Sequence, residues 1–180
     1  LRGWAVLPHL KNMRVFGDKI VNTNSKGLRG QKEYAYGKPP GVTRIVALGD
    51  SFGFGDEVNE EDTYCARLEK LLPDTEVINL GVSGYGHDQM LLTLKEEGIK
   101  YQPDIVLLGF LYYDLERNLR TFRFYAKPKF ELERGQIKLK NSPVPSPEDF
   151  MNREFFRLKI LDLFDMVTQR VAWKFRRNQK

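Results

Sequence analysis

Apolar residues form short runs in the middle of the chain, and each of the first two runs is followed by apolar residues at helical spacing. Residues 44–49 read Arg-Ile-Val-Ala-Leu-Gly, which is typical of a strand buried on both faces. Similar runs at 76–80 and 104–109 predict two more strands. Residues 59–72 and 88–97 show the period of amphipathic helices. This β-α-β-α-β order favours a parallel sheet with right-handed crossovers and with helices on both faces.

The first of these helices has recognisable ends. Asn59 is the predicted N-cap, with Asp62 three positions later, and Pro73 stops the helix. The predicted apolar face consists of Tyr64, Leu68, Leu71 and Leu72. Cys65 is the only cysteine, so it has no partner for an internal disulfide, and we expect it to be a small buried residue of this helix. Gly98 ends the second helix.

The flanking segments differ in character from this central part. Residues 1–42 are rich in Gly, Asn, Lys and Pro, so we interpret them as an irregular N-terminal extension. Residues 43–126 form the predicted core domain. Residues 127–180 are expected to hold an inserted hairpin and a long helix. The hairpin spans 129–139 and turns at Arg134-Gly135-Gln136.

The long helix, over residues 147–178, begins with a clear cap signal. Ser146 is the predicted N-cap, Pro147 the first helical residue and Asp149 an acid in the first turn. The apolar stripe of this helix consists of Phe156, Ile160, Leu163, Phe164, Val167, Val171 and Phe175. Such a stripe is typical of a core or subunit contact, and a peripheral membrane contact is the alternative.

Charge and hydropathy narrow the class of protein. The 180 residues carry a formal net charge of +5, and the acid-free tail from Arg170 to Lys180 supplies this excess. The rest of the chain is nearly neutral. A basic tail can contact anionic lipid or nucleic acid, but a solvated helix end is the favoured interpretation, and no nucleic-acid partner is expected. The longest apolar run, 105–113, is far shorter than the ~20 residues of a membrane span. The chain begins at Leu1 without a signal-peptide pattern, so its localisation stays open, an extracytoplasmic or membrane-associated one included.

Each predicted strand ends in a loop of unusual composition. In an open parallel sheet, ligands and catalytic groups gather at the carboxyl ends of the strands. The first loop, 49–55, reads Gly-Asp-Ser-Phe-Gly-Phe-Gly and presents Ser51 among glycines that permit sharp turns and close backbone approach. The second loop, 79–86, reads Asn-Leu-Gly-Val-Ser-Gly-Tyr-Gly, and the third, 109–114, reads Gly-Phe-Leu-Tyr-Tyr-Asp.

These three loops, in this order, resemble sequence blocks of the SGNH hydrolase (GDSL-type esterase) family. The resemblance implies an α/β protein with a three-layer α/β/α flavodoxin-like fold. It also implies that Ser51, preceded by Asp50, is the nucleophile, and that the main-chain N–H groups of Ser51 and Gly84 stabilise the oxyanion. Such an esterase forms an acyl-enzyme from a small-molecule, lipid or carbohydrate ester, and it requires no metal and no organic cofactor.

The third loop departs from the family pattern. The family has an asparagine donor just before the aspartate of this block, whereas this chain has Tyr113 before Asp114. A tyrosine hydroxyl can donate a hydrogen bond, but it lies much further from its backbone than an asparagine amide does. Asn118 is the alternative donor.

The general base is the second departure. The family's Asp-x-x-His block supplies the base and its orienting aspartate, and no such sequence occurs among the 180 residues. The chain has two histidines, His9 and His87, of which His87 follows the second loop and is the alternative base. We expect the block to follow residues 127–180 in a longer chain, which leaves the predicted fold incomplete at its C-terminus. A looser match over 24–29 places Arg29 either near the substrate or in a structural turn.

Three other interpretations use the same residues. Residues 49–53 also satisfy the Gly-x-Ser-x-Gly elbow of α/β-hydrolases, but too few strands precede them. A phosphate-binding loop would need a Gly-Lys-Ser/Thr ending, and Asp56 and Glu57 follow here instead. The main rival is a binding or scaffold protein that keeps the hydrolase fold without turnover, because Tyr113 replaces the asparagine and the Asp-x-x-His block is missing.

Overall fold

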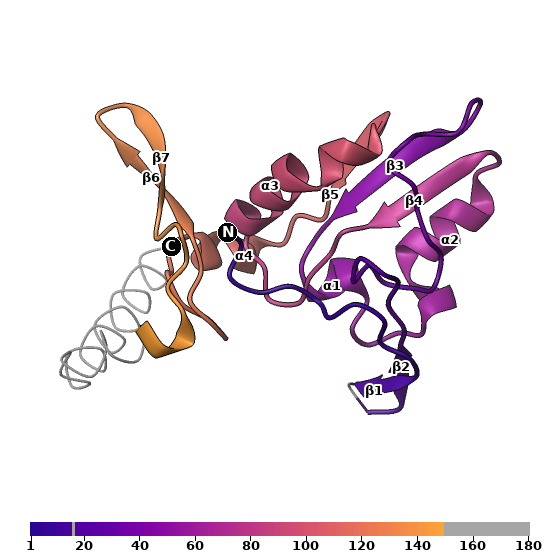
Figure 1. Ribbon diagram of the computed structural model, residues 1–180, viewed down its shortest axis with the longest axis horizontal. Helices are drawn as coiled ribbons and strands as arrows, with labels where there is room; N and C mark the ends of the chain where they lie inside the picture. The colour runs from indigo at the N-terminus through magenta and orange to yellow at the C-terminus, as the bar shows by residue number, and fades with distance from the viewer. Residues whose placement is uncertain (16, 150–180) are drawn as a thin grey trace, which may run out of the picture. The chain divides into compact units, whose positions relative to one another are not determined.

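A three-stranded parallel sheet is the centre of the protein. The computed structural model describes residues 1–15 and 17–149, and the chain divides into two units, Leu1–Val144 and Pro145–Lys180 (Figure 1). In the first unit the strand order is β4 (Thr75–Asn79), β3 (Thr43–Leu48) and β5 (Ile105–Leu108). Ile45 of β3 pairs in parallel with Val77 of β4 and with Ile105 of β5. The predicted parallel α/β sheet is therefore confirmed.

Helices pack on both faces of β3 and β4. Val46 and Leu48 face one way and pack with α3 (His87–Glu96), whereas Ile45 and Ala47 face the other way and pack with α2 (Tyr64–Leu71). Successive residues of a strand point to opposite faces, so a strand covered on both sides must be apolar throughout. The prediction that this strand is buried on both faces is confirmed, and Figure 1 shows α2 and α3 on either side of it.

Strand β5 is apolar but largely exposed, unlike β3. The exposed fractions of Ile105, Val106 and Leu108 are 44%, 43% and 52%. β5 lies at the edge of the sheet, where β3 is its only hydrogen-bonded neighbour among the described strands. The apolar run of the sequence therefore predicts the strand correctly, but not its exposure.

The start of α2 differs from the prediction. Asn59 makes no side-chain capping hydrogen bond and instead precedes a short 3-10 turn, η1 (Glu60–Asp62). Thr63 is the N-cap, because its Oγ1 accepts a hydrogen bond from the main-chain N–H of Ala66 at 3.3 Å. The 3-10 turn delays the start of the helix by four residues.

The predicted apolar face of the helix is wrong in part. Cys65, as expected, is buried, and Leu68 packs against the core beside it. Tyr64, Leu71 and Leu72 are exposed instead. Their positions follow helical spacing, but the helix turns them away from the sheet.

The remaining elements connect and flank the sheet. They are β1 (Met13–Val15), β2 (Lys19–Val21), α1 (Ser51–Phe54), η2 (Gly98–Tyr101), α4 (Tyr112–Asn118), β6 (Lys129–Glu133) and β7 (Gln136–Lys140). The strands β6 and β7 form the predicted antiparallel hairpin, and Arg134 and Gly135 at its turn both have positive φ angles of 50° and 77°. Among the described helices, none has the length and hydropathy to cross a membrane.

The cap of the predicted long helix is present in the second unit. The Ser146 Oγ accepts a hydrogen bond from the main-chain N–H of Asp149 at 3.1 Å, as an N-cap does. The predicted apolar stripe, from Phe156 to Phe175, lies outside the described residues.

Residues 1–42 are mostly irregular, as expected, but they contribute to the core. Leu28 is buried together with Val46 and Ile78, and Trp4 and Tyr34 pack against the same cluster. The core therefore includes residues that precede Thr43.

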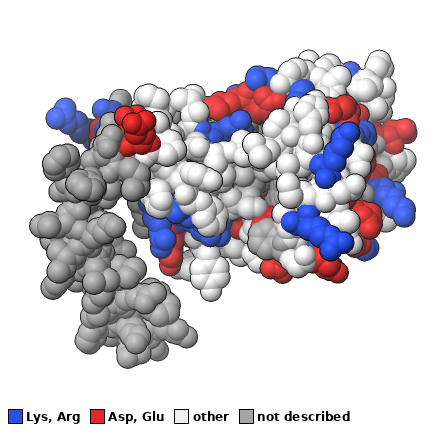
Figure 2. Space-filling view, turned by 60° about the horizontal axis from the view of Figure 1, so that its bottom comes forward, with Lys and Arg blue, Asp and Glu red and all other residues white. Residues whose placement is uncertain are grey.

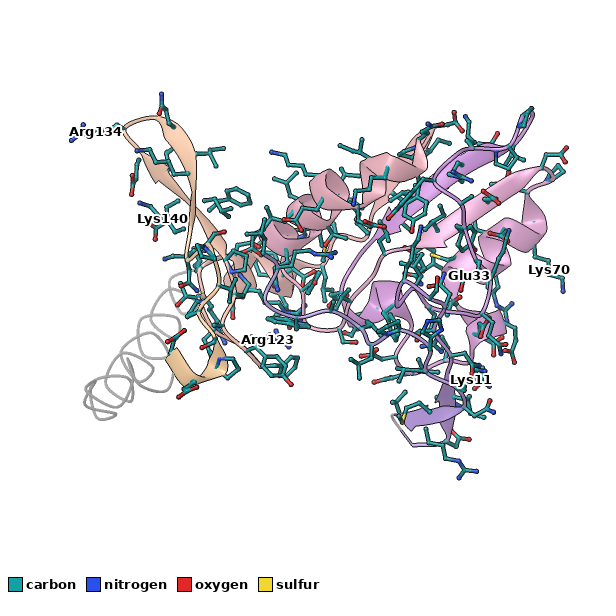
Figure 3. All side chains as sticks on the ribbon, in the orientation of Figure 1. Lys11, Glu33, Lys70, Arg123, Arg134 and Lys140 are labelled. Atoms are coloured by element: carbon teal, nitrogen blue, oxygen red, sulfur yellow. The ribbon has the colours of Figure 1, made fainter. Side chains whose placement is uncertain are left out.

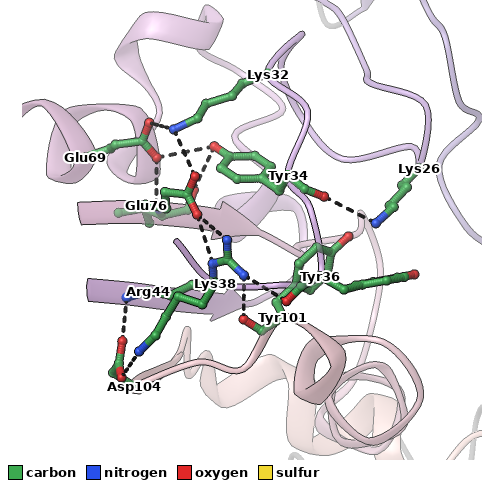
Figure 4. A network of polar contacts seen from close by, with 11 residues as sticks. Lys26, Lys32, Tyr34, Tyr36, Lys38, Arg44, Glu69, Glu76, Tyr101 and Asp104 are labelled. Carbon is green, nitrogen blue, oxygen red and sulfur yellow. Dashed lines mark hydrogen bonds and ion pairs between the residues drawn. The ribbon is translucent and has the colours of Figure 1, made fainter. Parts of the chain in front are cut away.

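A polar network holds this N-terminal segment to the sheet (Figure 4). The Arg44 guanidinium on β3 is fully buried; it pairs with Glu76 of β4 and donates to the carbonyl oxygens of Tyr36 and Tyr101, at 3.1 and 2.8 Å. Lys38 pairs with Asp104 just before β5.

On the outside, Lys, Arg, Asp and Glu are interspersed over the described surface that Figure 2 shows, with uncharged areas between them.

Candidate active site

The loops after β3 and β5 lie where the strand order of the parallel sheet reverses. The chain passes from β3 to β4 on one side and then crosses over to β5 on the other side of β3. In an open parallel sheet, a crevice forms where the order reverses, at the carboxyl ends of the strands. Ser51 follows β3 directly, and α4 follows β5. The candidate nucleophile therefore lies at the position where such sheets bind ligands.

The loop that carries Ser51 is tightly built. The Asp50 carboxylate caps the short helix α1 by accepting a hydrogen bond from the Phe52 N–H at 3.0 Å. A Cβ on Gly49 would lie only 2.8 Å from the Cα of Gly53, so this position requires glycine. Ser51 is half-buried, and its Oγ makes a long contact of 3.5 Å with Asp50 Oδ2. The Ser51 hydroxyl is thus presented at the end of β3 with only a weak internal partner.

The loops after β3 and β4 are in direct contact. The main-chain N–H of Val82 donates to the carbonyl oxygen of Gly49 at 3.1 Å, and the Asn79 side-chain amide donates to the carbonyl oxygen of Gly53 at 3.0 Å. A Cβ on Gly81 would lie 2.5 Å from the Phe54 nitrogen, so the two backbones meet without room for a side chain. The structure therefore brings together the two loops that the sequence predicted to share one site.

Gly84 has the conformation that its loop requires. Its φ of +83° is in the region that favours glycine, and an added Cβ would lie 2.6 Å from the ring of Phe124. Phe124 and Arg123, which is labelled in Figure 3, belong to the segment after α4. Neither the Ser51 N–H nor the Gly84 N–H takes part in the main-chain hydrogen bonds of turns, loops and caps within residues 1–15 and 17–149. Ser51 is half-buried and Gly84 is buried.

The third loop places two adjacent residues in opposite environments. Tyr113 is 67% exposed and contacts the ring of Tyr112 edge to face, whereas the Asp114 side chain is fully buried. Asp114 forms an ion pair with Arg117, which also pairs with Asp50. Burial raises the pKa of Asp114 to about 6; the nearby charge of Asp50 adds to this rise, and Arg117 opposes it.

Asn118 and His87 lie together at the start of α3. The Asn118 Oδ1 accepts a hydrogen bond from the Asp88 N–H at 3.2 Å, and its Nδ2 lies 3.5 Å from His87 Nδ1. The His87 ring stacks on Phe110 with a centroid distance of 4.8 Å, and burial lowers the pKa of His87. The Asn118 amide is thus occupied with the helix start and with His87. His9 lies in the N-terminal segment, where its main-chain N–H donates to Asn24.

The contacts of Arg29 favour a structural role. Its guanidinium donates to the carbonyl oxygens of Gly55, Val58 and Ile20, at 3.1, 2.8 and 3.3 Å. These bonds tie the N-terminal segment to the loop after α1. Of the two interpretations of Arg29, the turn agrees with the geometry.

Two buried cations near the candidate site were not predicted from the sequence. Arg117 has an exposed fraction of 9% and Lys127 of 0%. Lys127 forms an ion pair with Asp88 and donates to the carbonyl oxygen of Arg117 in α4. The spacing of Asp114 and Arg117, three residues apart on a helix, was the one local signal for this pairing. In the described part of the chain, no group of three His, Cys, Asp or Glu side chains is arranged to hold a metal ion.

Comparisons with known proteins find similarity to solved structures. No family model and no curated protein matches the chain. The similar structures include AlinE4, an SGNH-hydrolase family esterase, and a mutant of esterase AlinE4. Each has 30% sequence identity and a TM-score of 0.35, with 47% of this chain covered. The match spans 48% of the length of either solved chain.

Proposed function

We propose that this protein is a serine esterase of the SGNH type, with Ser51 as the nucleophile and a flavodoxin-like three-layer fold. The observation that carries the proposal is the contact between the loops after β3 and β4, through Val82 N–H and the Gly49 carbonyl oxygen. This contact holds Ser51 next to the second loop, which carries Gly84 at a positive φ angle.

The proposed reaction is acyl transfer in two steps. The Ser51 Oγ attacks the ester carbonyl carbon, its proton passes to a base, and the carbonyl oxygen becomes an oxyanion. The N–H groups of Ser51 and Gly84 stabilise that charge more strongly in the transition state than in the ground state. Collapse of the intermediate releases the alcohol, and water then hydrolyses the acyl-serine. Small-molecule, lipid and carbohydrate esters all suit this chemistry.

The general base has no clear candidate among these 180 residues, which contain His9 and His87 but no Asp-x-x-His sequence. Burial lowers the pKa of His87. Its Nδ1 lies 3.5 Å from Asn118 Nδ2, and its Nε2 is buried without a hydrogen-bond partner in the described part of the chain. The proposal therefore assigns the base to the histidine of an Asp-x-x-His block in a longer chain, as the resemblance implies.

A non-catalytic binding or scaffold role is the second candidate. The exposure of Tyr113 favours it, because a side chain that points to solvent in place of the asparagine donor supplies no hydrogen bond to an oxyanion. Loss of one such donor costs about 100- to 1000-fold in rate. Turnover by the full-length protein distinguishes the two candidates.

The test is hydrolysis of a short p-nitrophenyl ester by the full-length protein. Ser51→Ala should reduce kcat by at least about 1000-fold while the circular dichroism spectrum is unchanged. Ser25→Ala, which removes an exposed serine far from the site in sequence, is the matched control and should retain the parent rate. Equal rates for the parent and Ser51→Ala would overturn the proposal, and so would a parent protein that does not hydrolyse the ester.

A further inference from the structure

We propose that Arg117 is a positioning residue that locks the Ser51 loop and the Gly84 loop in the arrangement that the reaction needs. This inference rests on the proposed function, since it concerns the same site. Arg117 lies outside the three loops that carry the resemblance. It acts through the residues next to Ser51 and Gly84.

The contacts of one nitrogen carry the inference. Arg117 Nη1 donates to Asp50 Oδ2 at 2.8 Å and to the carbonyl oxygen of Tyr85 at 2.9 Å. Asp50 is the residue before Ser51, and Tyr85 is the residue after Gly84. A single side chain thus bridges the immediate neighbours of both proposed oxyanion donors.

The bridge is buried and strongly charged. The exposed fractions of Asp50, Asp114 and Arg117 are 2%, 0% and 9%. The Arg117 guanidinium lies between the two carboxylates and pairs with both. Charge-assisted hydrogen bonds shielded from water are stronger and more rigid than exposed ones. Loss of the guanidinium would leave two buried carboxylates facing each other and would release Asp50.

Asp50 transmits the position of Arg117 to Ser51. Its other carboxylate oxygen, Oδ1, accepts the Phe52 N–H and so caps α1, which begins at Ser51. The carboxylate is therefore held from both sides, by Arg117 on Oδ2 and by the helix on Oδ1. A shift of Asp50 would turn the first residues of α1 and move the Ser51 N–H.

Helix α4, which carries Arg117, is itself fixed in place. The Lys127 Nζ donates to the carbonyl oxygens of Arg117 and Arg120, at 3.1 and 3.2 Å, and pairs with Asp88 of α3. A Cβ on Gly86 would lie 3.1 Å from the Cβ of Arg117, so α4 rests directly on the second loop. Arg117 is therefore carried by a helix that is itself held in place.

The experiment compares two substitutions at Arg117 with one at Arg120 in the full-length protein. Arg120 lies three residues further along, just beyond the end of α4, is more than half exposed and pairs with Glu116, so Arg120→Gln removes an equal charge at an exposed position. In Arg117→Gln, kcat for a short p-nitrophenyl ester should fall by about 10- to 100-fold with KM within about threefold, because displaced donors weaken transition-state binding above all. Arg120→Gln should keep both constants near those of the parent.

Hydrogen exchange gives a second readout that does not depend on turnover. The amides of residues 51–54 and of 84–86 should exchange faster together in Arg117→Gln, and neither should change in Arg120→Gln. If Arg117→Gln does not fold, Arg117→Lys carries the test. An ammonium lacks the planar fork of a guanidinium, so kcat should still fall by about fivefold or more at unchanged KM.

The outcomes separate this inference from the proposed function. If the parent hydrolyses the ester and the Arg117 variants keep its kcat, whether or not KM changes, the inference is overturned and the esterase assignment stands. Faster exchange in one loop alone would also overturn it. If the parent itself is inactive, the proposed function fails and the inference fails with it.

Discussion

Asp114 shows how a single buried charge links the site to the stability of the fold. Its carboxylate is fully buried beside Asp50, and Arg117 is its ion-pair partner in the described part of the chain. Burial raises its pKa from 3.8 to about 6. Between these values the folded protein retains a proton that the unfolded chain has released, so the contribution of Asp114 to stability is lost as the pH rises.

Asp114→Asn removes this pH-dependent contribution. The difference in unfolding free energy, variant minus parent, should therefore shift in favour of the variant as the pH rises from about 4 to about 7. Urea unfolding at both pH values measures it. The constant offset from the lost charge partner of Arg117 cancels in that comparison. A difference that is equal at the two pH values, or that shifts the other way, would contradict the assigned pKa direction.

At this scale the sequence revealed some site residues and missed others for a physical reason. Ser51 and Gly84 stand in short glycine-rich loops after apolar runs, and both features are local in sequence. Arg117 is different, because Asp50 is 67 positions away and only the packing of α4 brings the two together. Tyr113 was identified as the departure from the family pattern, but its exposure depends on the direction in which α4 begins.

Helix α2 shows which signals set the bounds of an element. Both Asn59 and Thr63 are suitable N-cap residues, and the sequence favoured Asn59. The structure has a 3-10 turn between them and gives the capping bond to Thr63. The three strands of the parallel sheet, in contrast, were predicted to within one residue at each end, since their apolar runs are short and sharply bounded. The short strands β1 and β2 were not predicted.

The two candidate caps of α2 can be compared directly by substitution. Thr63→Ala should lower the unfolding free energy by about 1 kcal/mol, because it leaves the Ala66 N–H without its acceptor. Asn59→Ala should change it by less than about 0.5 kcal/mol. Chemical denaturation of both variants is the measurement, and the reverse order of effects would place the cap at Asn59.

At the scale of the whole molecule, residues 1–42 are part of the folded unit and not only an irregular flank. The sequence could not show this, because the segment has little regular structure and its contacts are made by single side chains. Leu28 enters the same apolar cluster as Val46 and Ile78, and Trp4 donates from its ring nitrogen to the carbonyl oxygen of Ser83 at 3.0 Å. The second loop of the site is therefore supported by the start of the chain.

Leu28→Ala tests this integration. Truncation of a buried leucine leaves a cavity and should lower the unfolding free energy by about 2–5 kcal/mol. Leu7→Ala, in the same segment but at a residue that is 68% exposed, should cost less than about 0.5 kcal/mol. Similar small effects of both substitutions in thermal or urea unfolding would show that the segment is not packed on the core.

The proposed esterase function depends on a reactive hydroxyl at the end of β3, next to the glycine loop after β4. Treatment of the full-length protein with a fluorophosphonate, followed by peptide mapping, reports on this arrangement most directly. We expect one adduct, on Ser51, that is absent from Ser51→Ala. An adduct on another residue, or none on a folded protein, would contradict the assignment of Ser51 as the nucleophile.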